Sequence, residues 1–239
     1  YAQTGAIFGL SQLWLTLYSF PFMVAVQEMC GRIGMVTGKG LAGVIRTHYS
    51  KKLLLIAVVL LSVANIINIG ADLGAMGQAT SLISPLSFGI SLILITVFTL
   101  TSAILIPYKT YAKILKYFAA TVLSYIVAAF FIQQDWKAIT FSVLVPHMEW
   151  NKDFLLNITA FLGTTISPYL FFWQADEEVE EEIEKKKITA FGKGTPRLSK
   201  SDIHQMRADT IAGMFLSNLI AFFIIITASS TLTTNGNHP

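Results

Sequence analysis

The residues with the clearest chemical potential are 163 to 168, which read Gly-Thr-Thr-Ile-Ser-Pro near the middle of a long apolar stretch. Proline lacks an amide hydrogen, and its ring clashes with the carbonyl four residues earlier, which here belongs to Thr164. We therefore expect a helix break at Gly163 and Pro168 that frees this carbonyl. Carbonyls freed in a broken membrane helix can bind cations. The alternative is a simple proline kink, which membrane helices tolerate.

A second candidate is Asp72, the charged residue that lies deepest in the apolar pattern. Ionisable groups at such depth are costly unless they face protein, water or an ion. Asn68, Asn65 and Ser62 precede Asp72 at helical spacing, so the four side chains form one polar stripe that should face inward. The stripe fits either hydrogen bonding between helices or a relay for protons or ions. The sequence does not separate these two interpretations.

Enzymatic and nucleic-acid chemistry have little support. The sequence shows no serine-histidine-acid set and no phosphate-binding loop, so we expect no enzyme and no cofactor. The four histidines lie in separate segments that form no metal cage, and the single cysteine, Cys30, excludes an internal disulfide. The acidic run from Asp176 to Glu184 precedes three lysines and predicts a solvated helix end rather than a metal-sensing patch.

The elements that must position these residues are apolar and long. Hydrophobic residues make up 54% of the chain and charged residues only 13%, and the charges gather in short segments between apolar runs. This spacing is typical of a bilayer-spanning protein. The runs are residues 4 to 27, 53 to 71, 86 to 106, 117 to 134, 154 to 175 and 210 to 230. We therefore predict an all-α polytopic membrane protein, a single transmembrane domain with six transmembrane helices visible.

The basic residues set the orientation. Of the 17 lysines and arginines, all but Lys137 and Lys152 lie in residues 31 to 52, 107 to 116 and 176 to 209. Cytoplasmic loops retain such residues, so these three segments are predicted to be cytoplasmic. The positive charge then reports orientation in a lipid bilayer rather than a nucleic-acid partner. We expect a multi-pass protein of a cell membrane, and the oligomeric state stays open.

The chain opens at Tyr1 without an initiator methionine or a basic leader, and it ends in a polar tail after an apolar run. These features lead us to expect a fragment of a longer protein, with further spans on both sides.

Several stretches resemble the Nramp family of divalent-metal transporters, whose fold is the LeuT-type inverted repeat. The resemblance covers nearly the whole chain and rests on residues 31 to 34, 37 to 42, 71 to 73 and 163 to 168, together with Asn218. It implies that the six runs are family helices two to seven. The family's first helix, whose Asp-Pro-Gly-Asn type motif binds the metal, would then be missing before Tyr1.

The metal site that the resemblance implies is altered in this chain. The family pattern Ala-Thr-Ile-Met-Pro-His is matched by Thr-Thr-Ile-Ser-Pro-Tyr at residues 164 to 169. The resemblance assigns a carbonyl ligand to Thr164 and a hydroxyl or water-mediated contact to Ser167. Serine replaces a soft thioether by a hard oxygen, which adds Mg²⁺ to Mn²⁺ and Fe²⁺ as a candidate substrate. Tyr169 replaces a proton-exchanging imidazole.

Proton coupling rests on a partly matched pattern. Asp72 matches a family acid, but Ala75 stands where many members carry a second one. The candidate residues of a proton or polar pathway are Asp72, Asn65, Asn68, Tyr169 and Asn218. The leading hypothesis is a secondary transporter of divalent cations that works by alternating access, with proton coupling. The alternatives are a transporter of the same fold for another solute such as an amino acid, a channel, or a membrane protein that transports nothing.

Overall fold

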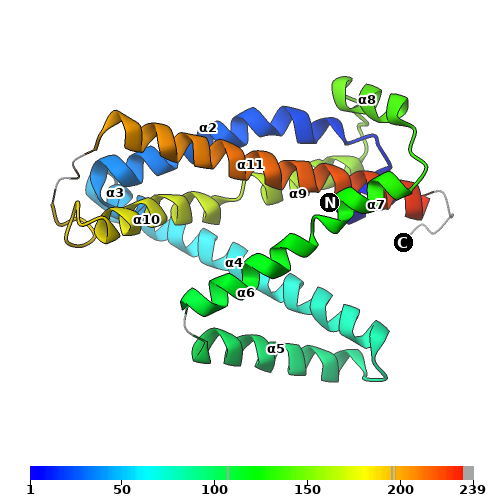
Figure 1. Ribbon diagram of the computed structural model, residues 1–239, viewed down its shortest axis with the longest axis horizontal. Coiled ribbons are helices and arrows are strands. Elements are labelled where there is room, and N and C mark those ends of the chain that lie inside the picture. The colour runs from blue at the N-terminus through cyan, green and yellow to red at the C-terminus, as the bar shows by residue number, and fades with distance from the viewer. Residues whose placement is uncertain (107, 195, 197, 234–239) are drawn as a thin grey trace. The chain divides into compact units, whose positions relative to one another are not determined.

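The computed structural model describes residues 1 to 106, 108 to 194, 196 and 198 to 233. These residues form α-helices and connecting turns, with a short π-helical turn at residues 229 to 233 and no strand among them. The helices are α1 Ala2–Phe8, α2 Trp14–Thr37, α3 Leu41–His48, α4 Lys51–Ile83, α5 Phe88–Leu105, α6 Tyr108–Thr121, α7 Ser124–Phe131, α8 Trp136–Leu144, α9 Lys152–Thr165, α10 Pro168–Glu184 and α11 Lys200–Ala228 (Figure 1).

Several helix ends are fixed by local sequence. The Asn151 side chain accepts a hydrogen bond from the Phe154 amide at the start of α9. Ser199 and Asp202 form a reciprocal capping box at the start of α11. Gly38 follows α2 with a φ of 60°, the left-handed conformation that glycine adopts most readily. These caps supply partners for backbone groups that a helix terminus leaves unpaired.

Five stretches are long and apolar enough to cross a membrane among the residues described; two of them join consecutive α-helices, and a third continues from α11 into the π-helical turn. They are Lys51–Ile83, Phe88–Leu105, Ile114–Phe131, Lys152–Glu184 and Lys200–Leu232. The chain is thus a polytopic α-helical membrane protein, as its apolar runs predicted. The segment 107 to 116, predicted as a loop, is helical from Tyr108, while Pro107 lies outside the described residues.

The first predicted run, residues 4 to 27, does not form one helix. It is divided between α1 and α2, because Gly9 turns the chain with a φ of 58° and short-range hydrogen bonds continue the turn to α2. Gly5 lies against Ile225 and Gly9 against Ser229, so α1 follows the direction of α11. Further along, α2 runs the opposite way past α11, with Thr16 beside Asn218. The apolar composition of the run concealed a reversal of the chain.

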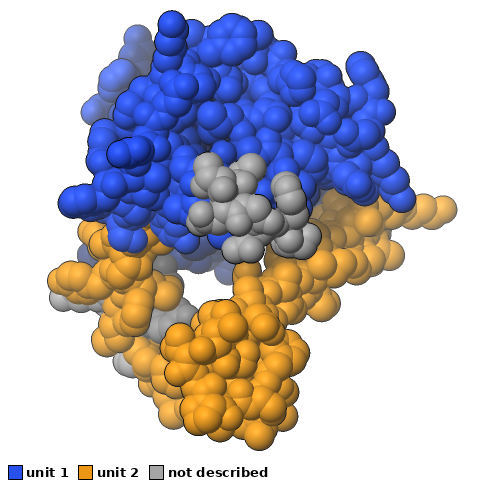
Figure 2. Space-filling view, turned by 90° about the vertical axis from the view of Figure 1, so that its right-hand side faces the viewer, with its two compact units in different colours: residues 1–50, 123–239 blue, residues 51–122 orange. Residues whose placement is uncertain are grey.

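The molecule consists of two compact units, which Figure 2 colours separately. The second unit, residues 51 to 122, contains α4, α5 and α6. There α4 packs against α5 at Gly77, where an added methyl group would lie 3.2 Å from the Cα of Leu92. The first unit, residues 1 to 50 and 123 to 239, contains the remaining helices and the helix break.

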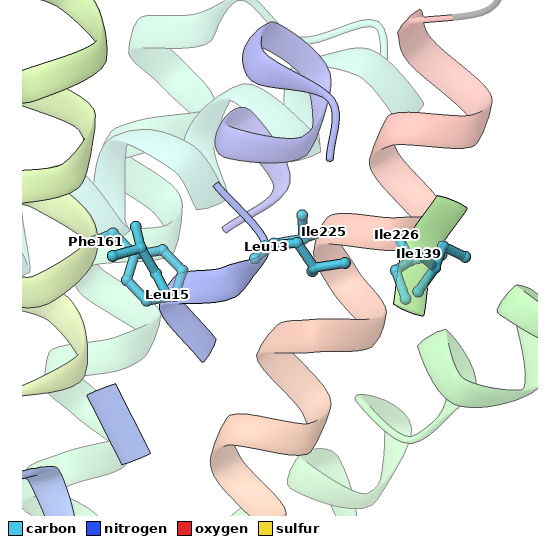
Figure 3. Packing of buried hydrophobic residues seen from close by; sticks show 6 residues of the cluster. All are labelled: Leu13, Leu15, Ile139, Phe161, Ile225 and Ile226. Atoms are coloured by element: carbon cyan, nitrogen blue, oxygen red, sulfur yellow. The ribbon is translucent and has the colours of Figure 1, made fainter. Parts of the chain in front are cut away.

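The core of the first unit lies where the turn between α1 and α2 meets α8, α9 and α11. Its cluster of buried apolar side chains consists of Leu13, Leu15, Ile139, Phe161, Ile225 and Ile226 (Figure 3). Burial of apolar surface of this kind stabilises the contact by about 25 cal/mol per Å² relative to water. The same cluster therefore holds α9, which leads into the helix break, against the start of α2 and α11.

The contact between α2 and α10 requires a glycine at residue 34. A methyl group there would overlap the carbonyl oxygen of Ala175 and lie 2.9 Å from its Cα. We expect Gly34→Ala to lower the free energy of unfolding by about 1–3 kcal/mol, because backbone atoms would have to move apart. Thermal unfolding of the purified full-length protein in detergent measures this change.

Gly213→Ala is the matched control for that substitution. Gly213 lies inside α11, and a methyl group there would meet no atom within 4 Å. Its thermal midpoint should stay level or rise slightly, since alanine has the higher helix propensity. Equal midpoints for both variants would contradict the close contact of α2 with α10.

Candidate functional site

The candidate site lies where α9 ends and α10 begins. The two helices follow one another along the chain, and Ile166 and Ser167 separate them (Figure 1). Ser167 has an extended backbone, and Pro168 occupies the first turn of α10, a position where the absence of an amide hydrogen has no cost. The apolar stretch is therefore two half-helices joined by a non-helical linker.

The linker changes which carbonyls are paired. The Ser167 hydroxyl donates to the Gly163 carbonyl at 3.0 Å, and the Ile166 amide donates to the Leu162 carbonyl at 2.7 Å. The Thr164 carbonyl, whose usual donor would be residue 168, receives no hydrogen bond from the described part of the chain. This oxygen lies at the carboxyl end of α9, where the helix dipole favours a positive charge.

Thr164 and Ser167 differ in exposure. The Thr164 side chain is exposed and donates to the Ala160 carbonyl, while Ser167 is buried. The neighbouring Thr165 is also buried, and its hydroxyl shares a 2.9 Å hydrogen bond with Tyr1 at the start of α1. The start of α1 therefore lies against the end of α9, beside the break.

The donor atoms near the break are neutral oxygens. Within the ranges that the structure describes, no group of three or more histidine, cysteine, aspartate or glutamate side chains could hold a metal ion. A cation at the break would therefore use carbonyl and hydroxyl oxygens from this chain. Such oxygens suit hard cations such as Mg²⁺ and Mn²⁺.

The other predicted residues lie elsewhere in the fold. Tyr169 is in the first turn of α10 and is exposed. Asn218, in α11, donates through Nδ2 to the Thr16 carbonyl of α2, and its Oδ1 is buried with no partner among the described residues. Asn218 lines a mostly apolar groove of about 340 Å³ between these helices. Its hydrogen bond ties α11 to α2.

The stripe on α4 does not face inward in the described chain. Asp72 and Asn68 are exposed and Asn65 is partly buried, because α4 packs on α5 through the face that carries Gly77. These three polar residues belong to the second unit, so the structure does not place them with Thr164 and Ser167 in one site.

The structure also shows polar contacts that the sequence analysis missed. Gln27 of α2 is buried and donates to the Leu170 carbonyl at 3.2 Å and to Gln174 at 3.0 Å. Gln174 in turn donates to Glu178 at 2.7 Å. A glutamine at the end of the apolar run 4 to 27 is the signal that could have revealed this contact, because buried amides need partners. These bonds tie α10 to α2.

The acidic end of α10 is less solvated than predicted. Glu178 and Glu182 are only 8% and 2% exposed, and both carboxylate oxygens of Glu182 lack a hydrogen-bond partner in the described part of the chain. They are buried because this face of α10 packs against the rest of the unit. Beyond the helix, Lys185 pairs with Glu181 at 3.0 Å, and this hydrogen bond raises the pKa of Lys185.

Ion pairs also link α2 to α11 and the end of α10 to the start of α11. Glu28 of α2 pairs with Arg32 at 2.5 Å and with Arg207 of α11 at 3.3 Å. Lys187 pairs with Asp202 at 2.7 Å, which links the end of α10 to the start of α11. These charges lie at the helix ends that the basic-residue count assigns to the cytoplasm.

The comparisons with known proteins agree with this architecture. The family model described as "Natural resistance-associated macrophage protein-like" matches residues 1 to 239. A divalent metal cation transporter MntH of Klebsiella pneumoniae subsp. pneumoniae is 25% identical over 245 aligned residues, covering 98% of this chain and 54% of that protein. An MntH of Yersinia pestis is 30% identical over 181 residues, covering 71% of this chain and 42% of that protein.

A third relative, the MntH of Granulibacter bethesdensis, is 23% identical over 173 residues, covering 71% of this chain and 39% of that protein. The chain spans about half the length of the curated relatives it matches. The match of the family model along all 239 residues settles the family. This chain, with its broken helix and its polytopic helical fold, belongs to the natural resistance-associated macrophage protein-like (Nramp) family.

Proposed function

We propose that this chain is part of a secondary transporter that moves divalent metal cations across a bacterial plasma membrane by alternating access. The observation that carries the proposal is the break between α9 and α10, where the Thr164 carbonyl has no donor among the described residues. Transporters with inverted repeats place substrate and ion sites at such discontinuous helices. The names of the bacterial MntH relatives support a divalent metal as the substrate.

The position of α1 supports a cation site that α1 shares with the end of α9. Helix α1 is a half-length element that begins beside Thr165 and turns back before α2. We infer that α1 is one half of the family's first, metal-binding helix, in place of the sequence-based expectation that this helix is absent from the chain, and that α9 is its counterpart in the second broken helix. The cation would then lie between the start of α1 and residues 164 to 167.

The donor set supports Mg²⁺ alongside Mn²⁺ and Fe²⁺ as the transported ion. Ser167 supplies a hydroxyl where the family pattern has a sulfur, and the Thr164 carbonyl is another hard oxygen. Mg²⁺ gives up its water reluctantly, so a short serine side chain leaves room for a hydrated ion. Alternating access would let the two half-helices open the site to each side in turn.

Uptake by the full-length protein in liposomes tests the proposal. We expect saturable uptake of Mn²⁺ or Mg²⁺ that a tenfold excess of the other ion inhibits. Uptake of an amino acid, with no response to either metal, would favour the other transporter of this fold. No uptake of any of these solutes into tight vesicles that contain folded protein would contradict the transport function.

Asp72 tests whether protons accompany the cation. Asp72→Asn removes the only acid of α4 while keeping the size of the side chain. If Asp72 relays protons, cation uptake by the variant should lose the dependence on external pH that the wild type shows. Gln78→Asn, a neutral change on the same helix, serves as the control. An unchanged pH profile in a folded Asp72→Asn variant rules out the relay.

A further inference from the structure

A closed set of hydrogen bonds joins α1, the turn that follows it, and α9. Asn157 of α9 donates through both hydrogens of its amide, to the Thr4 hydroxyl at 3.0 Å and to the Gln12 side-chain oxygen at 2.6 Å. Gln12 then donates through Nε2 to the Phe154 carbonyl at 3.1 Å. Gln12 is fully buried and Thr4 is 3% exposed. Thr4 and Gln12 therefore find their hydrogen-bond partners away from solvent, and Asn157, which joins them, is partly buried.

The contacts on either side of this set fix how α1 lies on α9. Tyr1 bonds Thr165 and stacks edge-on against Phe161 at a centroid distance of 5.1 Å. At the other end of α1, Phe8 stacks edge-on against Phe154 at 5.5 Å. The start of α1 thus meets the end of α9, and its end meets the beginning of α9. The two half-helices run antiparallel along their whole contact.

On the side of α1 opposite α9, α11 leaves α1 little freedom to move. Gly5 faces α11 so closely that a methyl group would lie 3.0 Å from the Cβ of Ala228 and would overlap the Ile225 carbonyl. If only apolar packing held α1 between α11 and α9, then α1 could shift slightly along its own axis. Hydrogen bonds between buried groups are directional, and a shift would leave a buried polar atom without its partner. One alignment of α1 on α9 satisfies all of them.

We propose that Asn157 is a positioning residue, which through Thr4 and Gln12 fixes the alignment of α1 on α9 and so the geometry of the cation site at residues 164 to 167. This role rests on the proposed transport function. Asn157 touches no ligand atom of that site. It acts by holding the end of α9 against the start of α1, in the way that outer-shell partners orient metal ligands.

The test removes the hydrogen bonds without changing the shape of the side chains. In the full-length protein, Asn157→Leu leaves the oxygens of Thr4 and Gln12 unpaired and should lower both the thermal midpoint and the affinity for Mn²⁺ and Mg²⁺. The triple variant Thr4→Val, Gln12→Met, Asn157→Leu replaces every partner by an apolar group of similar size. Since no buried polar side chain is orphaned, its midpoint should return close to that of the wild type.

The cation affinity of the triple variant decides the role. A positioning network predicts that its Kd, measured by calorimetry with each metal chloride, stays weaker than in the wild type by about tenfold or more. Thr159→Val, at an exposed residue of the same helix whose hydroxyl donates to the Leu155 carbonyl, should match the wild type in both measurements. A triple variant that recovers its midpoint and also binds with the wild-type Kd overturns the positioning role.

Two further outcomes are also decisive. If the triple variant does not fold, Gln12→Met alone takes its place, because Asn157 then keeps its bond to Thr4. A weaker Kd at an unchanged midpoint supports the role, and an unchanged Kd overturns it. A folded wild-type protein that binds neither cation overturns both the proposed transport function and the positioning role. If the wild type binds a cation and the variants bind it with the same Kd, only the positioning role is overturned.

Discussion

Replacing Pro168 by alanine should weaken cation binding by at least about tenfold, equivalent to about 1.4 kcal/mol. Alanine restores an amide hydrogen at the start of α10, and it removes the clash that keeps the carbonyl four residues earlier out of the helix ladder. The Thr164 carbonyl would then pair within a continuous helix and lose its freedom to bind an ion. The Kd of the full-length protein for Mn²⁺ and Mg²⁺, measured by calorimetry, reports the change.

Stability should change little in the same variant. A continuous helix gains a backbone hydrogen bond, which offsets the loss of the proline's restriction of the unfolded chain, so the thermal midpoint of Pro168→Ala should stay close to that of the wild type. Pro146→Ala is the matched control, because Pro146 is an exposed proline in the segment between α8 and α9. If Pro168→Ala folds and binds both cations with the wild-type Kd, the Thr164 carbonyl is not a ligand.

The second large effect concerns selectivity at Ser167. Ser167→Met introduces a thioether where the family pattern has one, and a soft sulfur favours Cd²⁺ over Mg²⁺. We expect the ratio of Kd values for Mg²⁺ and Cd²⁺ to shift by about tenfold in favour of Cd²⁺, again about 1.4 kcal/mol. Competition binding with the full-length protein measures this ratio directly.

The hydrogen bond of Ser167 requires a control for that experiment. The serine hydroxyl donates to the Gly163 carbonyl, so its loss frees a second backbone oxygen. Ser167→Ala loses the same hydrogen bond without adding sulfur, and it is therefore the control that isolates the thioether. A preference for Cd²⁺ that is strong in the wild type and equal in all three proteins would show that the side chain of residue 167 does not face the ion.

The sequence by itself determined the class of protein and indicated the helix break at Pro168, whereas Gly163, the other residue predicted to break the helix, lies inside α9. Apolar runs of bilayer length predict membrane helices whatever their partners, because the backbone must satisfy its own hydrogen bonds in lipid. The break follows from the proline at residue 168, whose missing amide hydrogen and ring act locally. The structure accordingly ends α9 at Thr165 and begins α10 at Pro168.

Only the tertiary structure decided how the half-helices are paired. The run from residue 4 to 27 contains enough apolar residues for one span, yet a turn at Gly9 reverses the chain, and hydropathy carries no information about direction. The same limit applies to the stripe that contains Asp72, since the sequence shows that its members share a face but not what that face meets. In the described chain this face of α4 is exposed.

The buried polar contacts were beyond the sequence for a related reason. Gln12 and Asn157 are 145 residues apart, and each lies in a mostly apolar stretch until folding brings their amides within 2.6 Å. Glu178 and Glu182 were predicted to be solvated because charge runs usually are, but packing buries this face of α10. Local chemistry fixes where a helix breaks, whereas long-range packing decides which polar groups satisfy one another.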